Sequence, residues 1–80
     1  VPLRVGGGTR LKIYEAMAAG LPVVSTSVGA EGLDYRDREN ILIADTPAAF
    51  AAACREALDD SALAARISGQ ARRMVADHFS

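Results

Sequence analysis

The sequence predicts an α/β fold in which a short parallel sheet lies between layers of helix. Three short apolar segments, at residues 1–4, 23–26 and 41–44, are typical of strands buried on both faces, because they lack a regular alternation with polar residues. Segments of helical composition or spacing separate and follow these strands. Apolar strands that alternate with helices indicate a parallel sheet covered on both sides.

The first helix is expected over residues 10–19, which contain only good or acceptable helix formers. Thr9 precedes it and can cap its free N–H groups. Gly20 stands where a helix C-cap glycine belongs, and Pro22 prevents the helix from resuming. These signals place a strand–helix–strand unit at the start of the chain.

The second half begins after a long polar loop that contains Gly29 and Gly32 and precedes the strand at residues 41–44. Thr46 and Pro47 are an N-cap and first-position pair that should start a second helix. A third helix should follow around Asp60. The residues expected on the buried stripes of these two helices are Phe50, Cys54, Ala57 and Leu58, and then Leu63, Ile67, Ala71, Met74 and His78.

Three strands are half of a doubly wound, Rossmann-like nucleotide-binding fold. A chain of 80 residues buries only about 60% of its unfolded surface and is marginal alone. Large core formers are few, with two Phe, two Tyr and no Trp. We therefore expect a three-layer fragment of a larger domain, with residues 1–80 as one partial domain. An unpaired inner sheet edge predicts that the isolated fragment self-associates.

Composition excludes several functions. Nine basic and ten acidic residues give a net charge of −1, which argues against non-specific nucleic-acid binding. No apolar run is long enough for a transmembrane helix. The single cysteine, Cys54, is expected as a small buried hydrophobe in a reducing compartment, so the predicted location is cytoplasmic, with peripheral membrane attachment of the full-length protein left open. Asp59 and Asp60 are interpreted as residues that end one helix and begin the next, rather than as metal ligands.

The candidate ligand-binding residues are concentrated in the segment that runs from Gly6 to Glu15. Three glycines, Gly6, Gly7 and Gly8, allow close approach of a ligand to the backbone and lead into a helix N-terminus, which attracts anions. Lys12 adds positive charge in the first turns, where an isolated helix prefers acidic residues. A bound phosphate would reverse that preference. The segment therefore predicts a diphosphate site.

Glu15 follows Lys12 by three residues, so both side chains can point to one face of the helix. A carboxylate at this place can accept two hydrogen bonds from the vicinal diol of a ribose. The alternative is an ordinary tight turn followed by an exposed ion pair. The spacing matches neither the dinucleotide fingerprint nor the Walker A loop, so no NAD or ATP site is predicted.

The run from Gly8 to Thr26, GTRLKIYEAMAAGLPVVST, resembles the signature of the group 1 (family 4-like) glycosyltransferases with the GT-B fold. The segments GAEGL at 29–33 and NILIAD at 40–45 are similar in order and spacing, as is the helical tail that ends HFS. The resemblance covers essentially the whole chain. It implies the second half of a GT-B C-terminal domain, whose parent transfers a sugar from a nucleotide-diphospho-sugar donor to an acceptor.

The resemblance also implies a partner N-terminal domain that binds the acceptor, transfer with retention, and no need for a metal or another cofactor. The family motif has two Glu residues separated by seven positions. The second Glu bonds the donor ribose and matches Glu15, whereas the first, which contacts the donor sugar, falls at Gly7. This departure leaves the recognition of the sugar open and no residue assigned to catalysis.

The remaining donor contacts are expected from backbone N–H groups of Gly7, Gly8 and Thr9 and from the charge of Lys12. Arg4 and Thr26 are weaker candidates for lining the cleft, Thr26 because it ends a strand. Two other functions stay open at this point: a non-catalytic nucleotide-sugar-binding module and a GT-B-fold sugar-nucleotide epimerase. A purely structural role is a third. The base, the sugar and the acceptor are not specified, and the fragment alone is expected to be inactive.

Overall fold

The computed structural model describes residues 4–5 and 10–79, with side chains from residue 11 onward. The elements follow the predicted order of strand, helix, strand, loop, strand, helix, helix. They are β1 (Arg4–Val5), α1 (Arg10–Ala18), β2 (Val23–Ser25), β3 (Leu42–Ile43), α2 (Pro47–Asp59) and α3 (Ser61–His78). The α/β class is confirmed.

The strands are shorter than the apolar segments that predicted them. The segment 23–26 forms a strand only to Ser25, and 41–44 only over Leu42–Ile43. The first strand includes Arg4 and Val5, and the rest of its predicted segment lies outside the described residues. The buried residues that flank β3 still form strand-like hydrogen bonds, because the N–H of Ala44 donates to Ser25 O at 2.9 Å and Ile41 forms an isolated parallel bridge with Asp37. The continuous ladder is therefore shorter than the buried segment.

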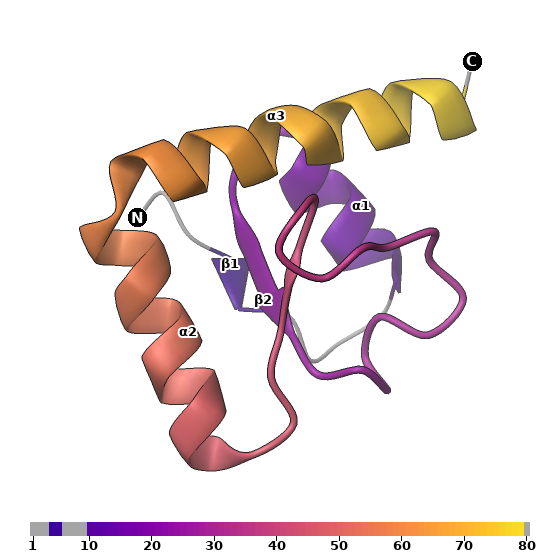
Figure 1. The fold of residues 1–80 in the computed structure, drawn as a ribbon. Coiled ribbons are helices and arrows are strands. Elements are labelled where there is room, and N and C mark those ends of the chain that lie inside the picture. Colours follow the sequence, from indigo (N-terminus) through magenta and orange to yellow (C-terminus); the bar gives the residue numbers. More distant parts are fainter. Residues whose placement is uncertain (1–3, 6–9, 80) are drawn as a thin grey trace.

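The sheet is parallel throughout, with the strand order β1-β2-β3. Val5 is in register with Val24, and Val24 with Leu42. Figure 1 shows α1 and α2 flanking the sheet on opposite faces, while α3 crosses the end at which the strands begin. Three layers are therefore present, as predicted, and the carboxyl ends of the strands point away from α3.

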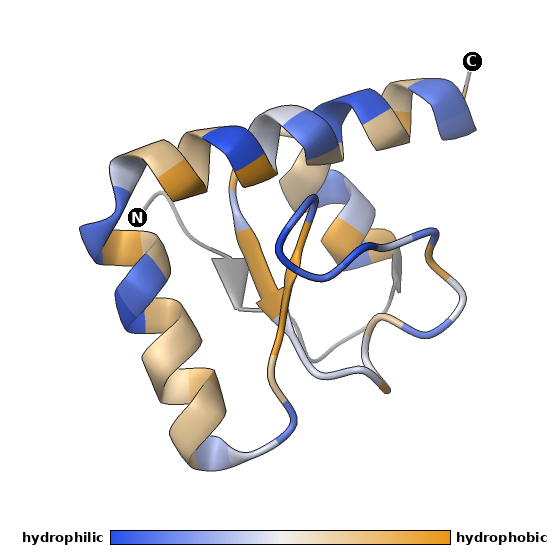
Figure 2. Cartoon of the chain, in the orientation of Figure 1, coloured by the Kyte–Doolittle hydropathy of each residue, from blue (hydrophilic) through white to orange (hydrophobic). Residues whose placement is uncertain are grey.

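Two apolar clusters hold these layers together, one on each face of the sheet. The cluster on the α1 face consists of Ile13, Ala16, Met17, Val23, Ala30, Leu33, Ile41 and Ala71. The cluster on the α2 face consists of Val24, Leu42, Ala57, Leu63 and Ile67. Successive strand residues point to opposite faces, so β2 supplies Val23 to one cluster and Val24 to the other. Figure 2 shows apolar residues on β2 and polar residues along α3 and in the last turns of α2.

The helix ends follow their sequence signals. Gly20 has a φ of 82°, its N–H donates to Met17 O, and the N–H of Leu21 donates to Ala16 O, each at 3.0 Å. These two bonds are the Schellman arrangement that a C-terminal glycine permits. Thr46 caps α2 by accepting from Ala49 N at 3.1 Å, as predicted. Asp60 caps α3 in the same way, from Leu63 N at 3.0 Å.

Two residues predicted on the buried stripes, Leu58 and His78, are exposed, and Phe50, Cys54 and Met74 are only half-buried. Leu58 is 57% exposed, because Ala57 is almost in line with Phe50 on a helix of 3.6 residues per turn and takes the inward position. His78 is exposed because it lies in the last turn of α3, at the end of the buried stripe. Cys54 is only half-buried, packed against the α2-face cluster.

The outer edge of β3 is closed by the chain itself. Asp37 accepts the N–H of Ile43 at 2.9 Å through Oδ1, and Arg38 donates its N–H to Ile41 O at 2.6 Å. Arg38 adopts a φ of 68° to make this turn. Among the described strands, β1 is paired only with β2. Because a covered edge offers no free ladder, any further strand would join on the β1 side.

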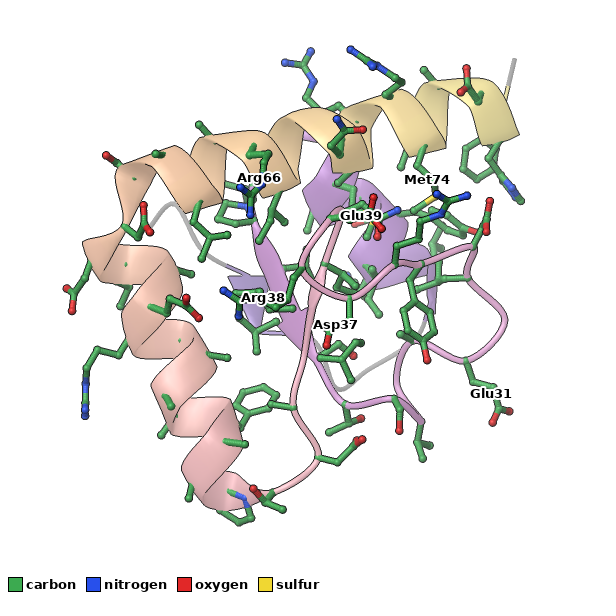
Figure 3. The ribbon with its side chains drawn as sticks, in the orientation of Figure 1. Glu31, Asp37, Arg38, Glu39, Arg66 and Met74 are labelled. Carbon is green, nitrogen blue, oxygen red and sulfur yellow. The ribbon has the colours of Figure 1, made fainter. Side chains whose placement is uncertain are left out.

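An ion pair fastens this edge loop to α2. Arg38 donates to both carboxylate oxygens of Glu56, at 3.0 and 2.7 Å, and Figure 3 shows its side chain reaching toward α2. The hydrogen bond from Arg38 holds the pKa of Glu56 below its ordinary value of 4.5. The same bond, with the charge of Glu56, raises the pKa of Arg38.

We expect Glu56→Gln to flatten the acid limb of the stability curve. A carboxylate whose folded-state pKa is lowered stabilises the fold above its unfolded pKa, and this contribution is lost as pH falls through the folded pKa. The variant has no such contribution to lose. Urea unfolding between about pH 3 and pH 7 would measure the difference. Arg38→Gln should flatten the limb similarly, and Asp59→Asn on the same helix is the control; parallel curves for wild type and Glu56→Gln would contradict the assignment.

Candidate functional site

The carboxyl edge of the sheet collects three connections. β1 ends there and α1 begins there, the chain leaves β2 there into the loop at 26–29, and it passes there from β3 to the start of α2 (Figure 1). In open parallel sheets, ligands bind outside the carboxyl ends of the strands, where loops and helix N-termini offer backbone donors. This edge is therefore the candidate site.

The helix α1 presents two charged residues on its outer face. Ile13 and Met17 are buried toward the sheet, at 1% and 0% exposure, and fix which face is inward. Lys12 and Glu15 are exposed, and together they line a hollow of about 210 Å³ along the helix. The prediction that these two residues share one face is confirmed.

The other predicted donor contacts fall largely outside the described residues. Gly7, Gly8 and Thr9 lie there. Arg4 is described as a backbone position in β1, and its side chain is not. The structure thus brings Lys12 and Glu15 together, and the binding roles of these two residues stay predictions, as do those of Arg4, Gly7, Gly8 and Thr9.

Thr26 follows the last residue of β2, as predicted for a residue at the cleft. Its Oγ1 accepts the N–H of Gly29 at 3.0 Å, and its carbonyl accepts the N–H of Ala30 at 3.1 Å. The hydroxyl therefore closes the turn at 26–29, which is the ordinary strand-end role that the sequence also allowed. Its predicted place in a ligand cleft remains a prediction.

Gly29 is required by close packing at this turn. A Cβ on Gly29 would stand 2.8 Å from Ser25 Oγ and 3.1 Å from Thr26 Oγ1. Ser25 is fully buried, and its hydroxyl donates to Thr26 O at 2.9 Å. A side chain at position 29 would displace two hydroxyls that shape the edge.

Asp45 joins two of the three connections and was missed by sequence reasoning. Its Oδ1 accepts both the N–H of Ser27, at 2.8 Å, and the hydroxyl of Ser27, at 3.0 Å. This clasp ties the loop after β2 to the connection between β3 and α2, across 18 positions of sequence. The available signal was an acidic residue directly after a buried strand, at the edge where ligands bind.

A second hollow lies at the opposite end of the sheet. It has a volume of about 360 Å³ and is lined by the loop at 34–40 and the second half of α3. Glu39 and Met74 face it from the two sides (Figure 3). Carboxylates and guanidinium groups of both elements mix there, and all lie on the side where the strands begin. The hollow is therefore separate from the carboxyl edge.

Asn40 and Glu31 lie away from the carboxyl-edge contacts described above. Asn40 is buried and satisfies the backbone before β3, as predicted, by accepting from Arg36 N at 2.8 Å and donating to Asp34 O at 3.4 Å. Glu31 is exposed and points outward from its loop (Figure 3). Within the described part of the chain, no group of three or more His, Cys, Asp or Glu side chains is placed to hold a metal ion.

We expect Asp45→Ala to loosen the loop at 26–29. The variant removes both hydrogen bonds to Ser27, and a single bond of this kind contributes about 1 kcal/mol, or about fivefold in an opening equilibrium. Amide hydrogen exchange at Ser27 should therefore accelerate by about that factor or more. Asp45→Asn, which keeps an acceptor oxygen, is the matched control. Unchanged exchange at Ser27 in Asp45→Ala would show that the clasp does not hold the loop.

Comparison with known proteins agrees with the fold. The family model described as glycosyl transferases group 1 matches residues 1–60. The crystal structure of the C-terminal domain of a glycosyl transferase group 1 family protein, LpcC, from Francisella tularensis matches with a TM-score of 0.87 at 23% sequence identity. The match covers 100% of this chain and 44% of that chain, so the chain spans less than half of the solved domain. A search of curated proteins found no significant match.

The family match spans three quarters of the chain, from β1 through α2, and includes the helix that carries Lys12 and Glu15. The structural match extends the same fold through α3. The fold is that of part of a GT-B C-terminal domain, and the chain belongs to the group 1 glycosyltransferase family.

Proposed function

We propose that this chain supplies part of the donor site of a glycosyltransferase that moves a sugar from a nucleotide-diphospho-sugar to an acceptor. The observation that carries the proposal is the shared outer face of Lys12 and Glu15 on α1, beside a hollow, on a helix that starts at the carboxyl edge of a parallel sheet. In this proposal residues 1–80 are part of the nucleotide-sugar-binding domain, and the acceptor is bound by a separate N-terminal domain.

Glu15 is assigned to the ribose of the donor. Its carboxylate is exposed and lies on the same hollow as Lys12, so both oxygens can reach a ligand placed along α1. A carboxylate accepts hydrogen bonds only, and two neighbouring hydroxyls of a ribose offer two donors. This pairing explains why an acidic residue stands on the ligand-facing side of a helix whose earlier turn is basic.

Lys12 and the backbone of Gly7, Gly8 and Thr9 are assigned to the diphosphate. Lys12 lies one turn nearer than Glu15 to the start of α1, about 4.5 Å along the axis, as a phosphate next to a ribose requires. Negative charge grows on the diphosphate as the glycosidic bond breaks, and a preformed set of positive donors stabilises it in the transition state. Arg4 and Thr26 would line the same cleft.

The sugar itself is the least specified part of the donor. In the family pattern an acidic residue that contacts the sugar falls at position 7, where this chain has Gly7. Sugar recognition must then come from the backbone of this loop or from outside the chain. Since the acceptor domain and any contribution from it are also outside, these residues alone should have no transferase activity.

The proposal also includes the location of the protein in the cell. None of the helices that the structure describes is long and apolar enough to cross a bilayer. The cytoplasmic location predicted from the single Cys54 is retained as a proposal.

We expect Glu15→Ala in the full-length protein to weaken nucleoside diphosphate binding by about ten- to a hundredfold, because a hydrogen bond to a charged group contributes about 1.5–3 kcal/mol. Isothermal titration with UDP, GDP and ADP measures this loss and identifies the base. Glu31→Ala, which removes another exposed carboxylate far along the chain, is the control. An unchanged affinity in Glu15→Ala would contradict the assignment of Glu15 to the ribose.

We also expect the isolated chain to self-associate through the edge of β1. The outer edge of β3 is already occupied by Asp37 and Arg38, so β1 is where a ladder can be extended. Static light scattering at increasing concentration should report a mass above the monomer's 8.4 kDa. A sharp monomer peak combined with cooperative unfolding would argue against this surface.

A further inference from the structure

Three aromatic rings join the end of α3 to α1. Tyr14 of α1 stacks on His78, with ring centroids 5.1 Å apart and planes 22° apart. Phe79 meets Tyr14 edge-on, with centroids 5.1 Å apart, and meets His78 edge-on at 4.7 Å. Each ring touches both others. We call Tyr14, His78 and Phe79 the ring cluster.

The ring cluster is attached to the helix that carries the proposed donor contacts. Tyr14 lies between Lys12 and Glu15 in sequence and is half-buried at the side of α1, next to the inward face. Any roll of α1 about its axis moves all three side chains together. With side chains extending about 5–6 Å from the axis, a roll of about 10° displaces the Glu15 carboxylate by about 1 Å. A shift of that size is enough to spoil a hydrogen-bonding geometry.

Ile13 and Met17 bury one face of α1 against the sheet and so set the coarse orientation of the helix. Ala16 of α1 and Ala71 of α3 are buried in the same cluster, and Met74 and Val75 of α3 are partly buried against it. Contacts between aliphatic side chains have little preferred angle. Rings in stacked and edge-on contact have preferred angles as well as distances, so they resist rotation more strongly.

We propose that the ring cluster fixes the fine roll of α1, within the orientation that Ile13 and Met17 impose, and thereby positions Glu15 and Lys12 toward the donor. Tyr14, His78 and Phe79 are positioning residues, which act through Glu15 rather than by touching the nucleotide. The inference rests on the proposed donor role of Glu15. It gives the last turn of α3, which lies outside the segment matched by the family model, a part in ligand affinity.

The test is nucleoside diphosphate affinity of the full-length protein, measured with whichever of UDP, GDP and ADP binds best. Tyr14→Leu keeps an apolar side chain and removes the ring, and we expect it to weaken binding by about three- to tenfold. Tyr14→Phe restores the ring and should bind as the wild type does. His78→Ala should weaken binding in the same direction, and because His78 is exposed, it provides the test if Tyr14→Leu does not fold by circular dichroism.

A double-mutant comparison separates positioning from general destabilisation. Once Glu15 is replaced by Ala, the roll of α1 affects only the contact from Lys12, so adding Tyr14→Leu should cause a smaller loss than it does in the wild type. An equal loss in both backgrounds would overturn the proposal, as would wild-type affinity in Tyr14→Leu or in His78→Ala. If Glu15→Ala alone left affinity unchanged, the proposed donor role would fail instead, and the two failures are thereby distinguished.

Discussion

Burial of the sheet on both faces is the constraint on which the arrangement depends. The backbone alternation of a strand sends Val23 toward α1 and Val24 toward α2, so one short strand must satisfy two cores. Neither face can be left open without exposing apolar side chains. The helix α3 meets both requirements, because its first half supplies Leu63 and Ile67 to one core and Ala71 belongs to the other. The order of layers follows from this division.

The same arrangement makes the two ends of the sheet different: one end is packed, and the other carries exposed loops. At the end where the strands begin, α3 crosses the sheet and the loop at 34–40 covers β3, with Arg38 fastened to Glu56. At the carboxyl end, the connections are held by short polar contacts, of which the Ser27–Asp45 clasp is the longest in sequence. Burial stabilises one end, and the other keeps exposed loops and helix starts available to a ligand.

The candidate site combines a buried support with an exposed surface. Ile13 and Met17 anchor α1 in the core, and helix geometry then places Lys12 and Glu15 on the outer face. The ring cluster then adds a contact between α1 and the far end of α3. Affinity for a donor would thus depend on residues that line no cleft, through the orientation of one helix. Membership of the group 1 glycosyltransferase family makes a nucleotide-sugar the proposed ligand, and this chain spans less than half of the solved relative.

The sequence by itself determined the class of fold, the order of its elements and the shared face of Lys12 and Glu15. Periodicity, caps and C-terminal glycine act over a few residues, so Gly20 and Thr46 could be assigned locally. Only the tertiary structure decided the contacts between distant segments: Asp45 with Ser27, Arg38 with Glu56, and Tyr14 with His78. It also decided that Ala57 and not Leu58 faces the sheet. The reason is that such pairings depend on how helices and loops meet across the sheet, which local residue patterns do not encode.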